Sequence, residues 1–477
     1  MSRRVRVSFL LGVLLLLLPS LRARADEKSE LEALRDEVRQ ERAALATERA
    51  ELAEQRRRVD DALAELEHEK ATRPQPTPTS VSGLEPGLAV NPESRASFEQ
   101  GPRPYLDVYG FAQLDGIYDF QRMDPDWKST LRPSKIPVDC PGDSGCGNNG
   151  EATLSAKQSR LGVKAGLPTP LGELFANIEF DLFATGSNAG ETNFRLRQAY
   201  GELGPVLAGQ TNSVFMDGDV FPNVVDYWGP IGMVFFRNPQ LRYTPLKNEN
   251  WQFAVALENP SSALDEGKIS EVAPELQVNS WNPSPDYTTH LKYTGPWGHV
   301  QAAAIFRVLG FQTTNVPGNN PNGTEYGWGV NLSSAINTFG DDQLLLQVVY
   351  GDGIASYMND GGVDLAPANK NLTHAEALPL LGWLAYYNHS WNEKWTSSIG
   401  FSENRQWNTS GQEDNAFETG QYGSVNLLYH PVPEMLIGPE FLWGRRENHN
   451  NDSEPDNRIQ LSVKYDFSGR IFGAAER

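Results

Sequence analysis

After its first 25 residues the chain has no long apolar stretch, and its mean hydropathy is −0.48. This excludes membrane-spanning helices there, because each needs roughly 20 predominantly apolar residues. It does not exclude spanning strands, since only every second residue of such a strand faces lipid. Basic residues are also few: 41 lysines and arginines stand against 61 acidic residues, for a net charge of −20. This balance argues against nucleic-acid binding, which needs a basic footprint.

Cysteine and histidine are scarce as well. The two cysteines, Cys140 and Cys146, are separated by five residues, and we expect them to form a disulfide in an oxidising compartment. No histidine lies near them, so a metal site is the weaker alternative there. The seven histidines lack metal-ligand spacing, and no Ser/His/Asp grouping suggests a triad. We therefore predict that the chain is not an enzyme and binds no cofactor or metal. The Asp/Gly-rich stretch at 360–364 could bind calcium, although such loops are more often simply solvated.

Residues 1–25 have the layout of a secretory signal peptide. Three arginines precede an apolar run at 9–18, and a small-x-small cleavage site follows at 23–25. The run is shorter than a membrane anchor needs. Removing this segment takes away five arginines and no acid, which changes the net charge from −20 to −25. Such a signal leads to the periplasm, the outer membrane or the exterior of a bacterium.

Residues 26–72 predict a helical arm. Apolar residues recur at every seventh position from Leu31 to Leu66, which is the spacing of a coiled coil. The second core position is polar in several heptads, so a single solvated helix stays open as the alternative. We expect this arm to lie in the periplasm, where it could contact peptidoglycan or another partner. The prolines that open the segment 73–103 end the helix and predict a flexible linker.

From residue 104 onward, short alternating segments recur between clusters of Gly, Asn, Asp and Pro, which is typical of strands and turns. About sixteen such segments can be counted. In the last one, 458–467, aliphatic and aromatic residues alternate with polar or charged ones. This pattern suits a barrel with lipid outside and water inside, although an edge strand of a soluble sandwich alternates in the same way.

The connections between these segments favour the membrane barrel. Very short turns alternate with long polar connections, and tryptophans lie near strand ends, where an interfacial girdle needs them. The long connections are predicted at 259–285, 310–324, 352–378, 405–419 and 447–456. The fold class that follows is an all-β transmembrane barrel of about 16 antiparallel strands at 104–467, with an N-terminal α-helical coiled-coil arm and a C-terminal extension at 468–477.

Alternation places several basic residues on the inner face of this barrel. The candidates for the pore lining are Arg160, Lys164, Arg195, Arg197, Arg242 and, with ambiguous parity, Arg237. A cation on the lipid face at mid-membrane costs about 2–4 kcal/mol, so these charges belong on the wet face. Guanidinium groups bind carboxylates with two parallel hydrogen bonds, and rings of cations favour anions in a pore. The alternative is that these arginines pair across the wall with Glu179, Asp181 and Asp115.

The segment 212–232 connects two predicted strands without alternating itself. It carries acidic and aromatic side chains that would narrow the lumen if the segment folded inward, although an ordinary surface loop is the alternative. The candidate residues of this constriction loop are Met216, Asp217, Asp219, Asp226 and Tyr227.

Several blocks of the sequence are similar to a known family. They are Tyr109–Phe120, Gln158–Gly162, Arg195–Gly201, Ala208–Asp217, Phe235–Thr244 and Tyr350–Ala355. Together with the predicted signal, arm and barrel, they make the chain resemble the DcaP-like trimeric outer-membrane porins. The resemblance implies a homotrimer, surrounded by outer-membrane lipid, whose pores take up small anionic solutes and dicarboxylates in particular.

Two features depart from the resemblance. Ten residues follow Phe467, where such barrels usually end on an aromatic, and the acidic total is high for an anion channel. A phosphate- or sugar-selective porin and a structural barrel that tethers the envelope therefore stay open as alternatives.

Overall fold

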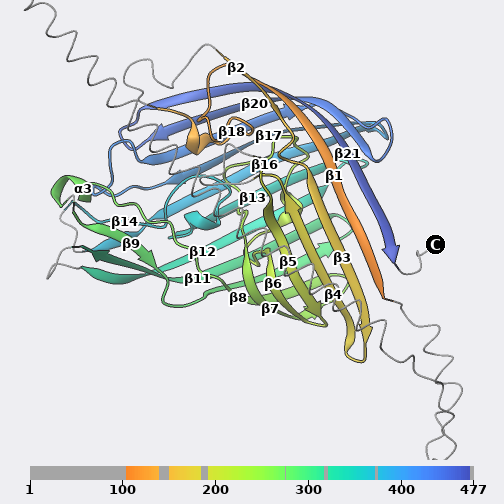
Figure 1. Cartoon of the computed structure of the whole chain (residues 1–477), viewed down its shortest axis with the longest axis horizontal. Coiled ribbons are helices and arrows are strands. Elements are labelled where there is room, and N and C mark those ends of the chain that lie inside the picture. Colours follow the sequence, from red (N-terminus) through yellow and green to blue (C-terminus); the bar gives the residue numbers. More distant parts are fainter. Residues whose placement is uncertain are drawn as a thin grey trace, which may run out of the picture. The chain divides into compact units, whose positions relative to one another are not determined.

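A computed structural model describes residues 104–138, 150–183, 192–273, 275–315, 321–370 and 374–472. The predicted signal peptide, coiled-coil arm and linker lie outside the described residues, as do both cysteines. The described part of the chain forms one 19-stranded antiparallel sheet that closes on itself, because β1 (Tyr105–Asp119) pairs with β21 (Ser453–Phe472) (Figure 1). Among the described residues, no helix is long and apolar enough to cross a membrane.

The other strands follow one another around the ring with the chain. They are β2 (Glu151–Ser155), β3 (Arg160–Thr169), β4 (Gly172–Asp181), β5 (Arg195–Leu203), β6 (Val206–Asn212), β7 (Arg237–Lys247), β8 (Trp251–Glu258), β9 (Gln277–Trp281), β10 (Asp286–Gly295), β11 (Gly298–Thr314), β12 (Asn322–Asn337), β13 (Gln343–Asp352), β16 (Pro379–Asn392), β17 (Trp395–Gln406), β18 (Phe417–Asn426), β19 (Leu428–Tyr429) and β20 (Met435–Asn448). A separate two-stranded sheet, β14 (Leu365–Pro367) and β15 (Ala375–Ala377), lies in the connection between β13 and β16, which also contains the 3-10 turn η4 (Ala355–Tyr357). Other connections contain α3 (Ile269–Val272) and the 3-10 turns η1 (Pro133–Lys135) and η3 (Gly218–Val220).

Three of the nineteen strands continue a neighbour rather than add a position to the ring. Strands β2 and β3 pair with successive parts of β1, at 115–119 and 105–111. In the same way β9 and β10 share the partner β11, and β18 and β19 share the partner β17. The ring therefore has sixteen strand positions, which confirms the predicted antiparallel barrel.

The side chains follow the inverted pattern of a barrel in lipid. Outward positions hold large apolar residues such as Leu161, Ile178 and Val330, which are all exposed. Inward positions hold buried polar residues such as Asp115 and Gln460. Because successive side chains of a strand point to opposite faces, every strand supplies both surfaces at once.

The two rims of the barrel differ. Strands at one rim are joined by tight turns, such as 170–171 between β3 and β4 and 296–297 between β10 and β11, and both barrel termini lie there. Short turns mark the periplasmic rim of outer-membrane barrels, so the long loops lie at the extracellular rim. The ladder between β1 and β21 runs on to Phe472, five residues past the predicted barrel end.

Two of the predicted long connections were wrong. Most of 310–324 belongs to β11 and β12, which are joined by 315–321, and most of 447–456 belongs to β20 and β21, which are joined by 449–452. At the end of β11 the outward residues Gln312 and Thr314 are polar and exposed, while the inward residues Phe311 and Thr313 are buried. Because the outward positions are polar there, the sequence pattern resembles that of a loop.

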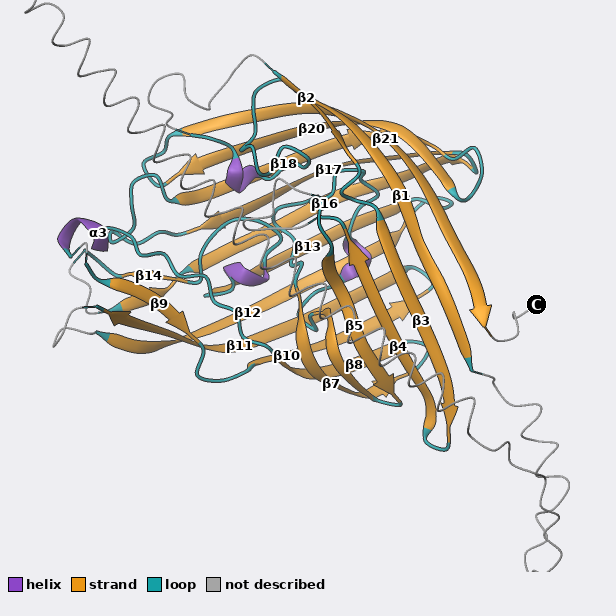
Figure 2. Ribbon diagram, viewed as in Figure 1, coloured by secondary structure: helices purple, strands orange, loops and turns teal. Residues whose placement is uncertain are grey.

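Two long loops fold into the barrel instead of covering it. Figure 2 shows loop segments and short helical turns, in teal and purple, within the ring of orange strands. Phe215 and Met233 of the loop 213–236, together with Tyr357 of the loop 353–364, form one apolar cluster with Leu345 and Tyr386 of the wall. This cluster fills the lumen beside β11–β20, so the space that remains lies on the side of β1–β7.

Gly209 of β6 is a position where the wall needs glycine. Its φ is +128°, and an added Cβ would lie 2.3 Å from the carbonyl oxygen of Ala199 and 2.6 Å from the Cα of Tyr200. Gly209→Ala should therefore lower the free energy of unfolding by about 1–3 kcal/mol. Gly201→Ala is the matched control, because its nearest atom would be 3.6 Å away. Urea midpoints and heat-modified gel migration measure both variants; equal stability of the two would contradict this account.

Candidate functional site

A cavity of about 860 Å³ occupies the part of the lumen that the apolar cluster leaves free. The inner faces of β1, β3, β5, β6, β7 and β21 line one side of it, and the loop 213–236 lines the other. Five cationic side chains surround it: Arg160, Arg195, Arg197, Arg237 and Lys464. Aromatic side chains complete the lining: Phe111, Phe221, Tyr227, Trp228, Phe235 and Phe236.

The cavity brings together only part of the set expected from the sequence. Four of the six candidate pore-lining residues and three of the five loop candidates (Met216, Asp226 and Tyr227) line it. Lys164 lies instead over the ring of Tyr109 at 4.5 Å, and Arg242 donates to Gln240 Oε1 at 3.1 Å and to the carbonyl of Asn212.

Arg195 and Arg197 are held by carboxylates of the neighbouring strand β4. Arg195 donates from Nε and Nη2 to Asp181 at 3.1 and 2.8 Å. Arg197 bridges two acids, with Nε 2.8 Å from Glu179 and Nη1 2.8 Å from Asp181. The wall pairing that the sequence left open is thus present for Glu179 and Asp181, in arginines that also line the cavity. Asp115 accepts hydrogen bonds from Gln158, Gln460 and Ser462 instead of an arginine.

Tyr227 ties the loop to this arginine wall. Its hydroxyl donates to Asp181 at 2.5 Å and accepts from Arg197 Nη1 at 2.9 Å, while its ring stacks on Phe183 with centroids 3.9 Å apart. The guanidinium carbon of Arg195 lies 5.2 Å from the ring centroid of Tyr227. These contacts fix the position of the loop 213–236 relative to β5.

Arg160 and Arg237 are less completely paired. The Nε of Arg160 is buried without a hydrogen-bond partner and lies 3.6 Å from Glu179. The Arg237 guanidinium lies over the ring of Phe235 at 5.0 Å, and no carboxylate within the described ranges forms an ion pair with it. Its side chain reaches the cavity despite its parity, because β7 begins at this residue.

Lys464 was missed as a site residue. It lies over the ring of Phe111 at 4.6 Å and pairs with Asp466 at 2.9 Å. Its inward parity on the last strand was the signal that could have identified it, but its distance in sequence from the arginine cluster concealed the connection. Strand β21 meets that cluster only because it pairs with β1.

Positive charge outweighs negative charge around the cavity. Of the nearby carboxylates, Glu179 and Asp181 are shared among arginines. Asp226 accepts hydrogen bonds from Thr130 and from two backbone N–H groups, and burial raises the pKa of its carboxyl. The net charge of the cavity lining is therefore positive, whereas that of the whole chain is negative.

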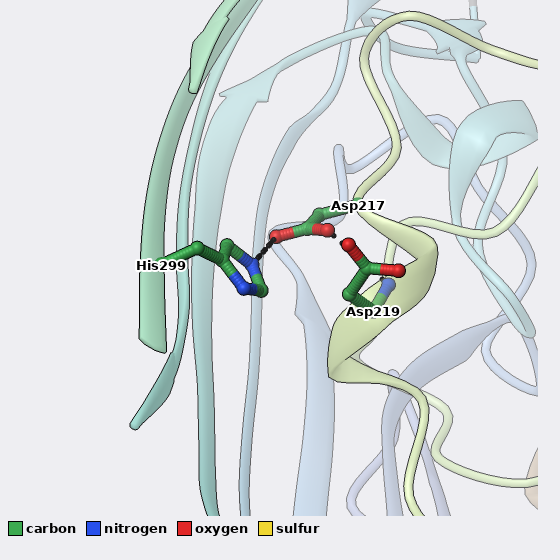
Figure 3. A group of neighbouring side chains, drawn as sticks. All are labelled: Asp217, Asp219 and His299. Atoms are coloured by element: carbon green, nitrogen blue, oxygen red, sulfur yellow. Dashed lines mark hydrogen bonds and ion pairs between the residues drawn. The ribbon is translucent and has the colours of Figure 1, made fainter. Parts of the chain in front are cut away.

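A second group of side chains anchors the loop to the opposite wall. Asp217 accepts a hydrogen bond from His299 Nε2 at 2.7 Å, with Asp219 nearby (Figure 3). Asp217 also accepts from Ser333 at 2.6 Å, and Lys292 contacts both Asp217 and Asp219. Burial alone would raise the pKa of Asp217, but the bond from His299 and the charge of Lys292 outweigh it and lower that pKa to about 2.

The same group has the donor atoms of a metal site. Ligand atoms of Asp217, Asp219 and His299 all lie within 4.8 Å of one another. The ammonium of Lys292 already contacts both carboxylates and supplies the positive charge that a cation would bring. The group therefore acts as an anchor that needs no ion.

A closed sixteen-stranded barrel with an apolar outer face and an infolded loop defines an outer-membrane channel. A family model described as DcaP outer membrane protein matches residues 96–467, and the chain belongs to that family. Its place is accordingly the bacterial outer membrane, and its role is that of a channel rather than of an enzyme.

The chain is similar to several solved structures, of which the first named here shares this fold. The outer membrane channel DcaP of Acinetobacter baumannii shares 21% identity at a TM-score of 0.65, over 76% of this chain and 98% of that one. An anion-selective porin from Comamonas acidovorans shares 9% at 0.49, over 76% and 100%. OmpT of Vibrio cholerae shares 12% at 0.45, over 76% and 98%. No curated protein matches the chain.

The anchor of the loop should be sensitive to acid. Because the folded pKa of Asp217 lies below its ordinary value of 3.8, its contribution is present above about pH 4 and is lost as the pH falls toward 2. Wild-type single-channel current should become noisier over that interval. Asp217→Asn should be noisy already at neutral pH, because it removes a charge-assisted contact of about 1.5–3 kcal/mol. Asp219→Asn, whose side chain is 69% exposed, is the control. A quiet Asp217→Asn channel would contradict this role.

Proposed function

We propose that the chain is a homotrimeric porin for the passive diffusion of small anionic solutes, dicarboxylates in particular. The observation that carries the proposal is the cationic cavity lining, in which no described carboxylate forms an ion pair with Arg237 and Arg160 has only a 3.6 Å contact with Glu179. The family resemblance supports the same solute class and the trimer.

The two kinds of arginine take different parts in this proposal. Arg195 and Arg197 form a rigid positive wall, because Asp181, Glu179 and Tyr227 hold them in place. Arg237 offers a guanidinium without a described carboxylate partner to a passing carboxylate, and Arg160, whose contact with Glu179 is long, adds positive charge beside it. At an effective dielectric of about 20, two unit charges 4 Å apart attract by about 4 kcal/mol, so each such guanidinium matters to an anion that has lost part of its water.

Passage requires that binding stays weak. A channel conducts only when its sites attract a solute enough to admit it and release it readily. The carboxylates of Glu179 and Asp181 reduce the field of the wall without cancelling it, which favours transit over retention. The loop 213–236 limits the width of the passage, so size selects among anions.

Phosphate is the second candidate solute. Arginine forks bind phosphate as well as carboxylate, and nothing in the geometry of this wall separates the two. Competition between succinate and phosphate in the same bilayer would rank them.

The N-terminal arm is proposed to lie in the periplasm. The start of the first described strand, Tyr105, on the rim of short turns supports this proposal. A coiled coil over residues 26–72 could join the protomers and contact peptidoglycan or another periplasmic partner.

Removal of single positive charges tests the proposal. At about 0.01 M salt, where the Debye length is about 30 Å, the zero-current potential of the wild type should indicate anion preference. Arg237→Gln should weaken succinate block several-fold, because it removes an unpaired donor. Arg242→Gln is the matched control: it removes the same charge from the same strand, but its guanidinium bonds to Asn212 and Gln240.

Screening supplies a further control. At about 1 M salt the Debye length falls to about 3 Å, and the difference between the two variants in selectivity should shrink. Cation preference of the wild type at low salt, or equal succinate block in both variants, would refute the proposed solute class.

A further inference from the structure

The outer surface carries a groove with one polar and one apolar end at the periplasmic rim. It has a volume of about 640 Å³ and lies over the turn 338–342 and the adjoining ends of β16, β17 and β18. Its apolar wall is formed by Phe339, Trp391, Ile399 and Val425, all exposed. Since Ile399 and Val425 are outward residues of spanning strands, this wall faces lipid.

The polar end of the groove is a hydrogen-bonded group built on Asp342. Its carboxylate accepts from the Tyr387 hydroxyl at 2.6 Å, from His389 Nδ1 at 2.7 Å and from the backbone N–H of Ser390 at 2.8 Å. The hydrogen bonds from Tyr387, Ser390 and His389 lower the pKa of Asp342 to about 2. An ionised Asp342 has no proton to give, so Nδ1 of His389 carries the hydrogen between them.

The orientation of His389 then follows. Its ring lies edge-on to Trp391 with centroids 4.3 Å apart and parallel to Tyr387 at 6.4 Å. With Nδ1 bound to Asp342, Nε2 is the nitrogen left for a ligand, and in the protonated imidazole it donates. The indole Nε1 of Trp391 is already bound to Ser397 at 2.9 Å. The turn 393–394 adds one charge of each sign, from Glu393 and Lys394, both exposed.

We propose that this groove holds one phospholipid of the periplasmic leaflet, with its phosphate at His389 Nε2 and an acyl chain along Ile399 and Val425. The occupant is argued from position and lining together. The groove opens on the lipid-facing side of an outer-membrane barrel, at the rim of short turns where the headgroups of that leaflet lie. Its polar end lies at the rim with Phe339 and Trp391, and Ile399 and Val425 lie deeper, since Ile399 pairs with Tyr387 and with Val425. A polar group at the rim followed by apolar side chains toward the membrane interior is the order of groups in a phospholipid.

The physical basis is the binding of two unlike parts of one molecule. An acyl chain in a bilayer is already surrounded by apolar groups, so packing on the apolar wall brings it no transfer out of water. Every outward surface of the barrel offers such packing, so the apolar wall alone selects nothing. The fixed imidazole, when protonated, adds a directed cationic donor, which binds an anionic phosphate more strongly than the neutral ester oxygens of a lipid without phosphate.

Native mass spectrometry of the full-length protein in detergent tests the proposal. Phosphatidylglycerol, phosphatidylethanolamine and a diacylglycerol with the same chains are added in turn. One molecule of either phospholipid should remain bound to each protomer, and diacylglycerol should bind at least tenfold more weakly. His389→Ala should reduce phospholipid affinity tenfold or more, and Ile399→Trp should do the same by filling the apolar wall.

His430→Ala is the matched control, because His430 lies in the neighbouring turn and does not line the groove. It should bind phospholipid as the wild type does. Heat-modified gel migration verifies that each variant folds. Equal binding of diacylglycerol and phospholipid, or unchanged affinity in His389→Ala, would overturn the proposal. So would a change in oligomeric mass with no change in lipid retention, because the groove would then be a contact between protomers.

Discussion

The core of a bilayer offers no hydrogen-bond partners, so every backbone N–H and C=O of a spanning strand must be satisfied by another strand. The ladder between β1 and β21 meets this constraint at the one place where the sheet could have had an edge. Closure has a second consequence, because it separates an outer face that must be apolar from an inner face that can be wet. The arginine wall, the infolded loop and the outer groove all depend on that separation.

The wet lumen is only partly open, because the loops 213–236 and 353–364 bury apolar side chains against the wall beside β11–β20. Such a packing inside a polar barrel needs polar anchors at its margins. Asp217 bonds to β11 and β12, and Glu440 of β20 accepts the backbone N–H groups of Val225 and Asp226. Because these anchors hold the loops against the opposite wall, the free part of the lumen lies beside Arg160, Arg195, Arg197 and Arg237. The cavity is therefore lined by cations although the whole chain is strongly acidic.

The barrel and the inner position of several arginines could be predicted from the sequence, because residues that face lipid and residues that face water alternate along a barrel strand. That pattern indicated the sixteen strands and the inward parity of Arg195 and Arg197. It failed where the environment changes along a strand. The end of β11 has polar outward residues, Gln312 and Thr314, and resembled a loop. Inward Leu345 and Tyr386 are apolar because a loop covers them. Arg237 lines the cavity because β7 begins at this residue, and Lys464 lines it because β21 pairs with β1. The alternation of residues along one strand reveals neither feature.

The central claim is that guanidinium groups in the lumen contact a passing dicarboxylate. Anomalous diffraction from crystals soaked in bromosuccinate at low ionic strength tests it most directly. The account predicts a bromine peak inside the cavity, with a carboxylate within hydrogen-bond distance of Arg160 or Arg237. Bromosuccinate bound only outside the cavity, in crystals of a channel whose current it blocks, would contradict it.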